Sequence, residues 1–592
     1  MTLGTATAAA ATAVALAGPA AAEPARIHDI QGAAHLSPLA GRQVEGVTGV
    51  VTAVDGGGFW MQDPAPDDDP ATSEAIFVFT RSRPAAAIGD AVTVAGTVTE
   101  FRPGGEATNL TTTEITSPTV TVTGPSGLPA ATVIGEGGRA APGSVIDDDA
   151  DGDVEAGGSF DADTDGIDFY ESLEGMRVTL NDPVAVGLRN NFGELPVLAD
   201  GGAGASVRTN RGGIALRSGD PNPERVLLDD AYARTPTVDV GDRLSTVTGV
   251  MTYSFGGFKL AVQAAPTVTP GAAAPERAKG AERGELAVAT FNVENLHQGS
   301  PDAKFAALAG QIVDGLRSPD ILTAEEIQDD SGPANDGTVT DAATVAKLTA
   351  AIEAAGGPAY AWRSIAPVNN ADGGQPGGNI RVGFLFRTDR GLEFTDRPGG
   401  DATTPVRVRK DARGPLLSAS PGRLDPANEA FTNSRKPLAG EFTWRGRRLF
   451  VVANHWNSKG GDQPAYSRFQ PPVQTTQPQR IAQAEVVAGF VRSVLAADRQ
   501  ALVVVAGDLN DFDFSTPIER LTDAGMTDLP ARLPAPERYT YVFEGNSQVL
   551  DHILLSPRLA GIRPAYDVVH MNAEYADQSS DHDPSVVRLS LR

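Results

Sequence analysis

The sequence predicts a multidomain protein in which two small all-β modules precede an α/β domain. The chain has 592 residues, which is more than one hydrophobic core usually organises. Its 65 Gly and 43 Pro favour turns and short strands over helical bundles. The hydrophobic pattern predicts the order of the domains. In the first half of the chain apolar and polar residues alternate as in strands, and in the second half segments with strand and helix periodicity follow one another.

The first two modules are predicted from short alternating apolar runs separated by Gly and Pro. Runs at 44–54, 59–62, 76–80 and 92–101 are typical of a small β-barrel or sandwich. Residues 126–269 show the same pattern of short apolar runs, and the segment 88–99 is similar in sequence to the segment 240–252, a near-echo of it. We therefore assign residues 24–125 and 126–269 to two all-β modules.

A different pattern follows residues 270–284, which are rich in Pro, Ala, Gly and charge and are typical of a linker. A buried strand is expected at 286–291, followed by helical spacing over 305–316. A second helical stripe at 481–495 precedes a strand at 501–506. This alternation predicts that residues 285–592 form an α/β domain whose helices pack on its sheets.

Composition excludes several classes of chemistry. The formal net charge of -27 disfavours a tight, metal-free DNA-binding protein, so a polyanionic substrate would need local basic residues and bound cations. The chain has no Cys, which excludes disulfides, Cys-ligated zinc and thiol catalysis. Oxygen ligands and His remain for any metal site.

The N-terminal segment predicts export. Residues 1–22 are almost entirely small and apolar and end in Ala20-Ala21-Ala22, which satisfies the small-residue rule for a signal peptide. The alternative is a disordered Ala-rich tail. No later segment has the ~18 uninterrupted apolar residues needed to span a bilayer, so the expected product is secreted, extracellular and without a membrane anchor.

The last half of the chain carries an ordered series of acidic, Asn and His motifs. Several follow an apolar strand, where a rigid sheet can present ligands. Phosphodiester hydrolysis needs a cation on the phosphoryl oxygens, a carboxylate that orients water and an acid at the leaving oxygen. The motifs are Asn292-Val293-Glu294-Asn295, Glu325-Glu326, Asn454-His455, Asp508-Leu509-Asn510, Asp551-His552 and Ser580-Asp581-His582-Asp583.

With these motifs, residues 286–592 resemble the endonuclease/exonuclease/phosphatase superfamily, which has the deoxyribonuclease-I-like fold. The segments 378–383 and 454–462 resemble its bacterial secreted nucleases in particular. The resemblance implies a four-layer α/β sandwich with two sheets between helices and all motifs at one rim. It also implies hydrolysis of extracellular DNA with low sequence specificity, with RNA as a secondary substrate.

The resemblance further implies a role for each matching residue. Asn292, Glu326 and Asp581 would hold Mg²⁺ or Mn²⁺. Asp508 and Asn510 would position the attacking water and the phosphate. The residues implied to face or contact the phosphate are His582 with its partner Asp551, His455, Arg381 and Lys459. The Tyr and Glu that accompany the first His in the pancreatic enzyme have no match, so His455 has no assigned partner.

The N-terminal modules resemble the oligonucleotide-binding-fold-like (OB-like) domains that precede such nucleases. The likeness lies in residues 30–39 and 58–64 of the first module and 168–176 of the second. Phe59 and Trp60 are candidates to stack on unpaired bases. Strand alternation places these two rings on opposite faces, so core packing is expected for at least one.

Two acidic repeats between the modules resemble the start of calcium loops. Each presents alternate carboxylates before a Gly. Neither repeat has Glu at the twelfth position counted from its first Asp, where Gly158 and Ser172 stand. The alternative to a calcium site is a solvated acidic loop. The candidate Ca²⁺ ligands are Asp147, Asp149, Asp151, Asp161, Asp163 and Asp165.

Two other functions compete with a nuclease. A lipid phosphodiesterase of the same superfamily, such as a sphingomyelinase, would use the same metal and His set. The OB-like modules argue against it, as does the lack of a recognisable exposed aromatic hairpin suited to membrane insertion. A non-catalytic nucleic-acid or matrix-binding protein would have eroded site residues, whereas this chain retains them.

Overall fold

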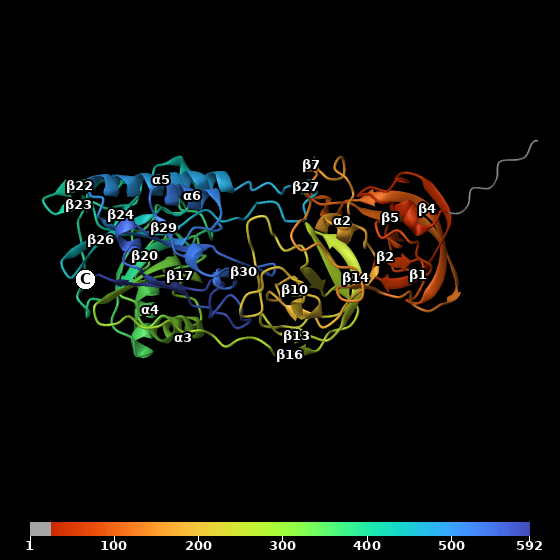
Figure 1. Cartoon of the computed structure of the whole chain (residues 1–592), viewed down its shortest axis with the longest axis horizontal. Helices are drawn as coiled ribbons and strands as arrows, with labels where there is room; N and C mark the ends of the chain where they lie inside the picture. The colour runs from red at the N-terminus through yellow and green to blue at the C-terminus, as the bar shows by residue number, and fades with distance from the viewer. Residues whose placement is uncertain (1–24, 592) are drawn as a thin grey trace, which may run out of the picture.

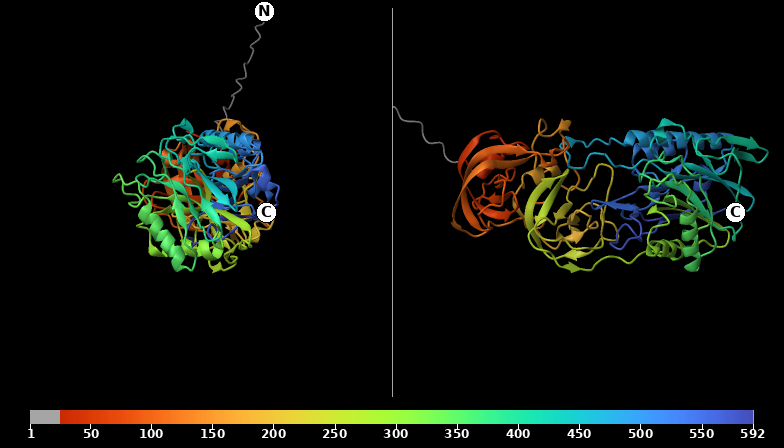
Figure 2. Two further views of the ribbon diagram at one scale, coloured as in Figure 1. Left: turned by 90° about the vertical axis from the view of Figure 1, so that its left-hand side faces the viewer. Right: turned by 180° about the vertical axis from the view of Figure 1, so that it is seen from behind.

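The computed structural model describes residues 25–591, and the predicted signal peptide at 1–22 therefore lies outside the described residues. Figure 1 shows three parts in a row, with the first module at one end, the α/β domain at the other and the second module between them. The view from behind in Figure 2 shows the same order. No helix within residues 25–591 is long and apolar enough to cross a membrane.

The first module is a closed five-stranded barrel with strand order β1-β2-β3-β5-β4. All of its strand pairs are antiparallel except β3 with β5, and β1 also pairs with β4. The short helix α1 (Ile27–Gln31) precedes it. The strands are β1 (Gln43–Val54), β2 (Gly58–Gln62), β3 (Ala75–Phe79), β4 (Asp90–Phe101) and β5 (Thr112–Pro125).

The second module is built on a nine-stranded sheet whose order is β16-β13-β9-β10-β12-β15-β14-β8-β6. The near-echo between the modules is a shared turn, because Gly89 and Gly241 both have positive φ, 89° and 95°. After this turn β4 runs unbroken, whereas the second copy divides into β13 and β14. The strands are β6 (Thr132–Ile134), β8 (Arg177–Leu180), β9 (Val184–Ala185), β10 (Leu195–Leu198), β12 (Val226–Asp229), β13 (Arg243–Leu244), β14 (Val247–Ser254), β15 (Gly257–Val262) and β16 (Val268–Thr269).

Two sheets form the middle of the α/β domain. The six-stranded sheet has the order β19 (Ala361–Arg363), β20 (Arg381–Phe386), β18 (Ile321–Ile327), β17 (Glu285–Leu296), β34 (Ser585–Ser590) and β33 (Ala565–Val568). The seven-stranded sheet has the order β21 (Leu392–Phe394), β25 (Leu438–Trp444), β26 (Arg447–His455), β28 (Leu502–Asp508), β32 (Asp551–Leu555) and β29 (Thr527–Asp528), with β24 (Gly422–Arg423) paired to β25.

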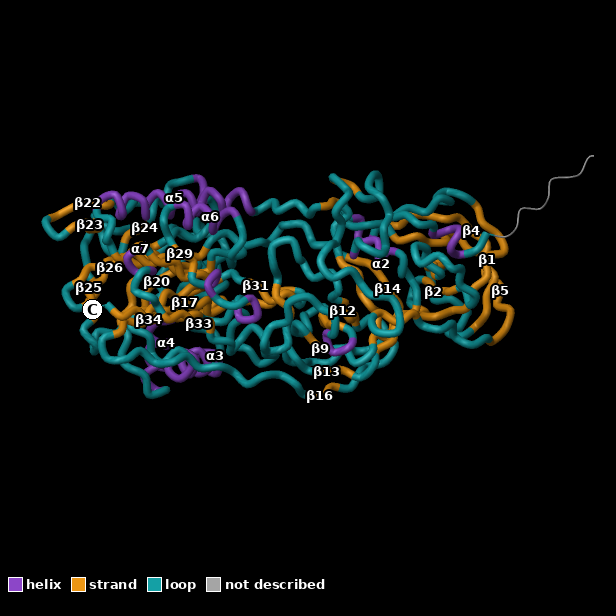
Figure 3. The backbone as a smooth tube through the Cα atoms, viewed as in Figure 1, coloured by secondary structure: helices purple, strands orange, loops and turns teal. Residues whose placement is uncertain are grey.

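Helices cover the outer faces of both sheets, so the domain has four layers. Along β28, Val504 and Ala506 face the core between the sheets, whereas Val503 and Val505 face the helices, as the strand period of two requires. In Figure 3 the helices lie above and below the strands. They are α3 (Asp302–Gly310) and α4 (Ala342–Ala354) on the first sheet, and α5 (Gln477–Ala497) and α6 (Thr516–Asp523) on the second. The helix expected at 305–316 is α3, which continues as a π-turn over Gln311–Gly315.

Strand pairing joins the second module to the α/β domain at two places. β7 (Gly152–Asp153) pairs with β27 (Phe469–Gln470), and β11 (Ile214–Ala215) pairs with β31 (Asn546–Gln548), which continues to β30 (Tyr541–Phe543). Tyr466 of the α/β domain is also packed into the core of the second module. The two parts therefore share both hydrogen bonds and core.

Candidate active site

The Asn, Asp, Glu and His motifs meet at one edge of the two sheets. β17 and β18 are parallel, as are β26 and β28, so Asn292, Glu326, His455 and Asp508 lie at the carboxyl ends of adjacent strands. β32 runs antiparallel to β28 and begins beside Asp508. His582 is held in the loop before β34 by a bridge to Tyr541.

Irregular backbone at the strand ends turns the site residues toward this edge. The register of β17 with β18 shifts between Asn292 and Leu296, and Glu326 has a φ of 62°. Gly507 has a φ of 137°, and a Cβ atom there would lie 2.0 Å from the carbonyl oxygen of Asn454. Only glycine fits this close approach of β28 to β26.

Asn292 connects two carboxylates. Its Nδ2 donates to Glu326 Oε1 at 3.0 Å and to Asp508 Oδ2 at 3.2 Å, while its Oδ1 accepts from the backbone N–H of Glu294 at 3.0 Å. The other oxygen of Glu326 accepts from the backbone N–H of Asn295 at 2.9 Å. Asn292 thus presents its amide nitrogen to the carboxylates, and its role as a cation ligand stays a prediction.

Asp508 is buried at the centre of the site. Its Oδ1 accepts from the backbone N–H of Asn510 at 2.8 Å, and its Oδ2 accepts from the Asn510 side chain at 3.2 Å. Asn510 is itself fixed, because its Nδ2 also donates to the carbonyl of Trp456 at 3.2 Å. Burial raises the pKa of Asp508 to about 7; His582 opposes the shift and Asp551 adds to it.

His582 is paired with Asp551, as the family resemblance implies. Its Nδ1 donates to Asp551 Oδ2 at 2.7 Å, and its Nε2 lies 3.9 Å from Asp508 Oδ2. The Tyr541 ring lies against the imidazole, with the ring centroids 4.8 Å apart. Burial by itself lowers the pKa of His582, but Asp551, Asp581 and Asp508 outweigh it and raise that pKa well above the usual value.

His455 is the second histidine that lies near Asp508. Its Nε2 lies 3.6 Å from Asp508 Oδ2 and 3.8 Å from Glu326 Oε1. Its Nδ1 has no hydrogen-bond partner among residues 25–591. Burial, Arg435 and His582 lower the pKa of His455 well below the usual value, so the imidazole is neutral near pH 7.

Two further buried residues lie at the site: Arg435, which belongs to no sequence motif, and Glu325, the neighbour of Glu326 in the Glu325-Glu326 motif. Arg435, which is 5% exposed, donates to the carbonyl of Trp456 and interacts electrostatically with Glu326 and Asp508. Its only sequence signal is its position just before β25. Glu325 is fully buried; burial, Asp551 and Asp508 raise its pKa well above the usual value.

The two predicted phosphate-binding cations differ in position. Arg381 is 2% exposed and lies 3.6 Å from Asp341, so the structure places its guanidinium inside the domain rather than on an accessible surface. Lys459 is 22% exposed, lies over the Phe512 ring and donates to Gln474 at 3.1 Å. Lys459 therefore remains reachable from solvent.

Asp581 lies at the entrance of the site. It is half-buried, and together with burial it raises the pKa of the Tyr541 hydroxyl. Within the described chain no hydrogen bond or ion pair joins Asp581 directly to Asn292 or Glu326. Its place in a metal shell therefore remains a prediction.

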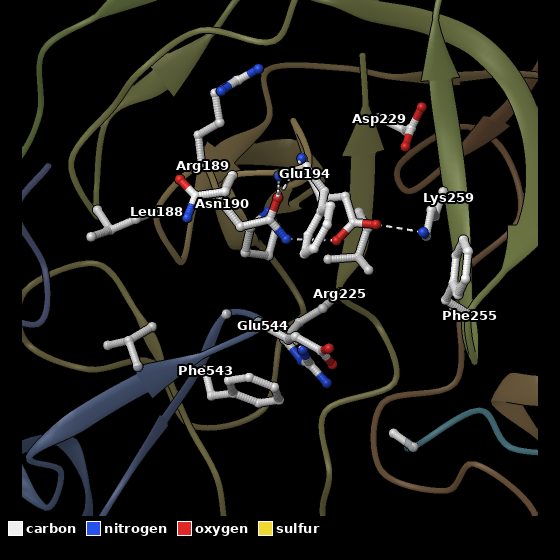
Figure 4. A pocket seen from close by; sticks show the side chains of 18 of the residues that line it. Leu188, Arg189, Asn190, Glu194, Arg225, Asp229, Phe255, Lys259, Phe543 and Glu544 are labelled. Carbon is white, nitrogen blue, oxygen red and sulfur yellow. Dashed lines mark hydrogen bonds and ion pairs between the residues drawn. The ribbon is translucent and has the colours of Figure 1, made fainter. Parts of the chain in front are cut away.

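A cavity of about 980 Å³ is lined by residues of the second module and of the α/β domain (Figure 4). Asp581 is one of its lining residues. Three phenylalanines on its wall are strongly exposed: Phe192 at 82%, Phe255 at 72% and Phe543 at 53%. Phe255 and Phe543 stand at hairpin turns. Exposed aromatic hairpins, which the sequence did not reveal, are therefore present, and they line the cavity between the two parts of the molecule.

The predicted base-stacking pair in the first module is buried. Phe59 is 0% exposed in the barrel core, and Trp60 is 7% exposed against Phe77 and Val250. Alternation on β2 sends one ring into the barrel and the other into the contact with the second module. Stacking of either ring on a base is thus incompatible with the structure.

Of the six predicted calcium ligands, the structure brings three together. Asp147, Asp149 and Asp165 each place a carboxylate oxygen within 4.8 Å of the others. The remaining three are exposed and stand outside this group: Asp151, Asp161 and Asp163.

Comparison with protein families supports the assignment of the C-terminal part. Residues 416–580 match the Endonuclease/Exonuclease/phosphatase family, so this part of the chain contains a domain of that superfamily. Residues 133–271 match a domain of unknown function, DUF8508. No curated protein matches the chain.

Solved structures resemble about half of the chain. Truncated TDP2 of Caenorhabditis elegans is 17% identical, with 52% of this chain and 97% of that chain covered and a TM-score of 0.33. TDP2 of D. rerio complexed with single strand DNA product is 16% identical, with 52% and 98% covered and a TM-score of 0.33. The human Nocturnin catalytic domain with bound sulfate is 13% identical, with 52% and 96% covered and a TM-score of 0.33.

Proposed function

We propose that this protein is a secreted, divalent-cation-dependent nuclease that hydrolyses DNA or RNA with low sequence specificity. One observation carries the proposal: two histidines lie near a single buried carboxylate, and the pKa of one is raised whereas that of the other is lowered. His455 Nε2 and His582 Nε2 lie 3.6 and 3.9 Å from Asp508 Oδ2. Titratable groups whose environments push their pKa values apart are typical of acid and base pairs.

The donor set at the edge fits Mg²⁺ or Mn²⁺. Glu326, whose side chain is 17% exposed, and the half-buried Asp581 offer hard carboxylate oxygens, the ligands these cations prefer. Asn292 would orient Glu326 through its amide nitrogen. When bound, the cation would neutralise charge on the phosphoryl oxygens.

The chain's own groups supply the remaining chemistry. Asp508, with a pKa of about 7, can orient the attacking water and accept its proton at Oδ2. The His582 imidazolium can donate from Nε2 to a phosphoryl oxygen while Asp551 holds its Nδ1. Neutral His455 can accept or donate one further hydrogen bond through Nε2. Lys459 is the accessible cation for the flanking phosphates.

The modules and the cavity favour a nucleic acid over a lipid. The first module is a closed five-stranded barrel, and a barrel of five strands supports the proposal of an OB-like module. The cavity wall carries exposed Phe rings, on which unpaired bases can stack. The rings of Phe255 and Phe543, at the hairpin turns, line this cavity, whereas insertion in a membrane requires an apolar face that points outward from the protein.

The test uses supercoiled plasmid with Mg²⁺ or Mn²⁺, and protein recovered from the culture medium after expression of the full chain. We expect the recovered protein to begin at Glu23, and wild type to nick the plasmid. His582→Ala should lower the rate by about 10²–10⁴-fold, and EDTA should abolish it. His28→Ala, in the first module, is the matched control and should retain wild-type activity.

Different substrates separate the competing functions. If the plasmid stays closed, linear single-stranded DNA, duplex DNA and RNA test for exonuclease or ribonuclease action. Release of phosphocholine from sphingomyelin without cleavage of any nucleic acid would assign a lipid phosphodiesterase instead. Failure on every substrate would favour a binding protein.

A further inference from the structure

The two acidic repeats of the second module meet face to face. The backbone N–H groups of Gly166 and Ile167 donate, both at 3.0 Å, to the carbonyls of the two residues before Asp147. These bonds set Asp165, from the second repeat, beside Asp147 and Asp149 from the first. One carboxylate oxygen of each lies within 4.8 Å of the others.

Asp165 is buried in this group without a partner. It is 1% exposed, and its Oδ1 has no hydrogen bond within residues 25–591. In the same part of the chain, no Lys or Arg forms an ion pair with Asp147, Asp149 or Asp165. A buried carboxylate is costly unless it is paired or coordinates a metal. Burial and the surrounding carboxylates raise the pKa of Asp165 to about 7.

We propose that Asp147, Asp149 and Asp165 form one composite Ca²⁺ site, separate from the catalytic cation. The ligands are all oxygens, and three carboxylates leave room for the backbone carbonyls and waters that complete a Ca²⁺ shell. Each repeat lacks the Glu that closes an independent calcium loop. The site therefore takes one ion for both repeats, rather than one ion for each.

The site lies in the segment that joins all three parts of the molecule. Shortly after Asp149 the chain forms β7, which pairs with β27 of the α/β domain. Glu155 then accepts from Arg102 of the first module at 3.2 Å and from Arg468 of the α/β domain at 3.1 Å. Bound Ca²⁺ would therefore hold the junction in its folded geometry, because a ligand that binds only the folded state stabilises it.

Calorimetric titration of the full chain with CaCl₂ tests the site. All proteins carry Glu326→Gln, which removes the main candidate ligand of the catalytic cation. The heat of Ca²⁺ binding then reports the composite site, and the absence of that heat would leave the proposed nuclease function untouched. We expect one Ca²⁺ per chain, and at least about tenfold weaker binding after Asp165→Asn or Asp149→Asn. Asp163→Asn, an exposed member of the same repeat, is the matched control and should bind as the parent does.

Two results would overturn the site: no heat of Ca²⁺ binding by the folded parent, or equal binding by the parent and Asp165→Asn. Circular dichroism establishes that each variant is folded. The junction is tested by limited proteolysis within residues 143–165 and 459–476. Ca²⁺ should slow cleavage there in the parent but not in Asp165→Asn, and equal cleavage with and without Ca²⁺ would refute its bracing role.

Discussion

His455 and His582 show how the surroundings of a side chain set its chemistry. Both are buried, which lowers a histidine pKa, but only His582 has a carboxylate hydrogen-bonded to its ring. Asp551 lies 2.7 Å from His582 Nδ1, whereas His455 Nδ1 has no partner among the described residues. At neutral pH His582 is therefore charged and His455 neutral.

This difference predicts the pH dependence of an Asp551→Asn variant. Because the pKa of His582 is raised, its protonated form persists above pH 6.5 in the wild type. Without the Asp551 charge that pKa falls, so the alkaline decline of kcat/KM should move to lower pH. Profiles of kcat/KM from pH 5 to 10 at fixed Mg²⁺ measure the shift.

Asp528→Asn is the control for this profile. Asp528 pairs with the neighbouring His552 at 3.0 Å but not with His582. Its profile should keep the wild-type alkaline limb. If both variants have the same limb as wild type, His582 is not the group whose protonation limits the reaction.

At the scale of the elements, the site is assembled where strands of the two sheets end. β26 and β28 are parallel to each other and end at His455 and Asp508. The two strands approach closely where Gly507 faces the carbonyl of Asn454. A displacement of a few tenths of an ångström here would move both candidate catalytic side chains. Packing at this edge thus couples the stability of the sheet to the geometry of the site.

Gly507→Ala should destabilise the domain. The new Cβ would lie 2.0 Å from the Asn454 oxygen at a φ of 137°, and such strain costs on the order of 1–3 kcal/mol or more. Urea unfolding followed by circular dichroism measures the change. Gly489→Ala, in the middle of α5 with nothing within 4 Å, should instead stabilise by about 0.5–1 kcal/mol. Equal stability of the two variants would contradict the close-approach argument.

At the scale of the whole molecule, the second module and the α/β domain behave as one structural body. Their contact includes two strand pairs and the Tyr466 ring, which is 9% exposed within the core of the second module. The Tyr466 hydroxyl donates to the carbonyl of Pro223 at 3.0 Å. Shared core and shared hydrogen bonds favour joint unfolding.

Calorimetry should therefore show one transition for these two parts. Tyr466→Ala should lower its free energy of unfolding by roughly 3–5 kcal/mol, because it removes a buried aromatic ring. Phe192→Ala, at an 82% exposed position, should change stability by less than about 0.5 kcal/mol. Two well-separated transitions in the wild type, with only one affected by Tyr466→Ala, would refute joint unfolding.

The local pattern of the sequence accounts for the sheets and for most of the site. The strand period of two and the helical spacing predict β28, α5 and the place of Asp508 at a strand end, because these features depend on neighbours within a few residues. The family resemblance, rather than local periodicity, implies the His582–Asp551 pair, which the structure shows at 2.7 Å.

Only the tertiary structure decides which distant side chains meet and which are covered. It buries Arg381, Phe59 and Trp60, brings Arg435 beside the carboxylates, and joins Asp165 to Asp147 and Asp149 across two repeats. None of these follows from local periodicity, since each depends on contacts between segments far apart in the chain. The sequence by itself determined the order of the chemical groups and the class of fold, and long-range packing determined their burial, partners and charge.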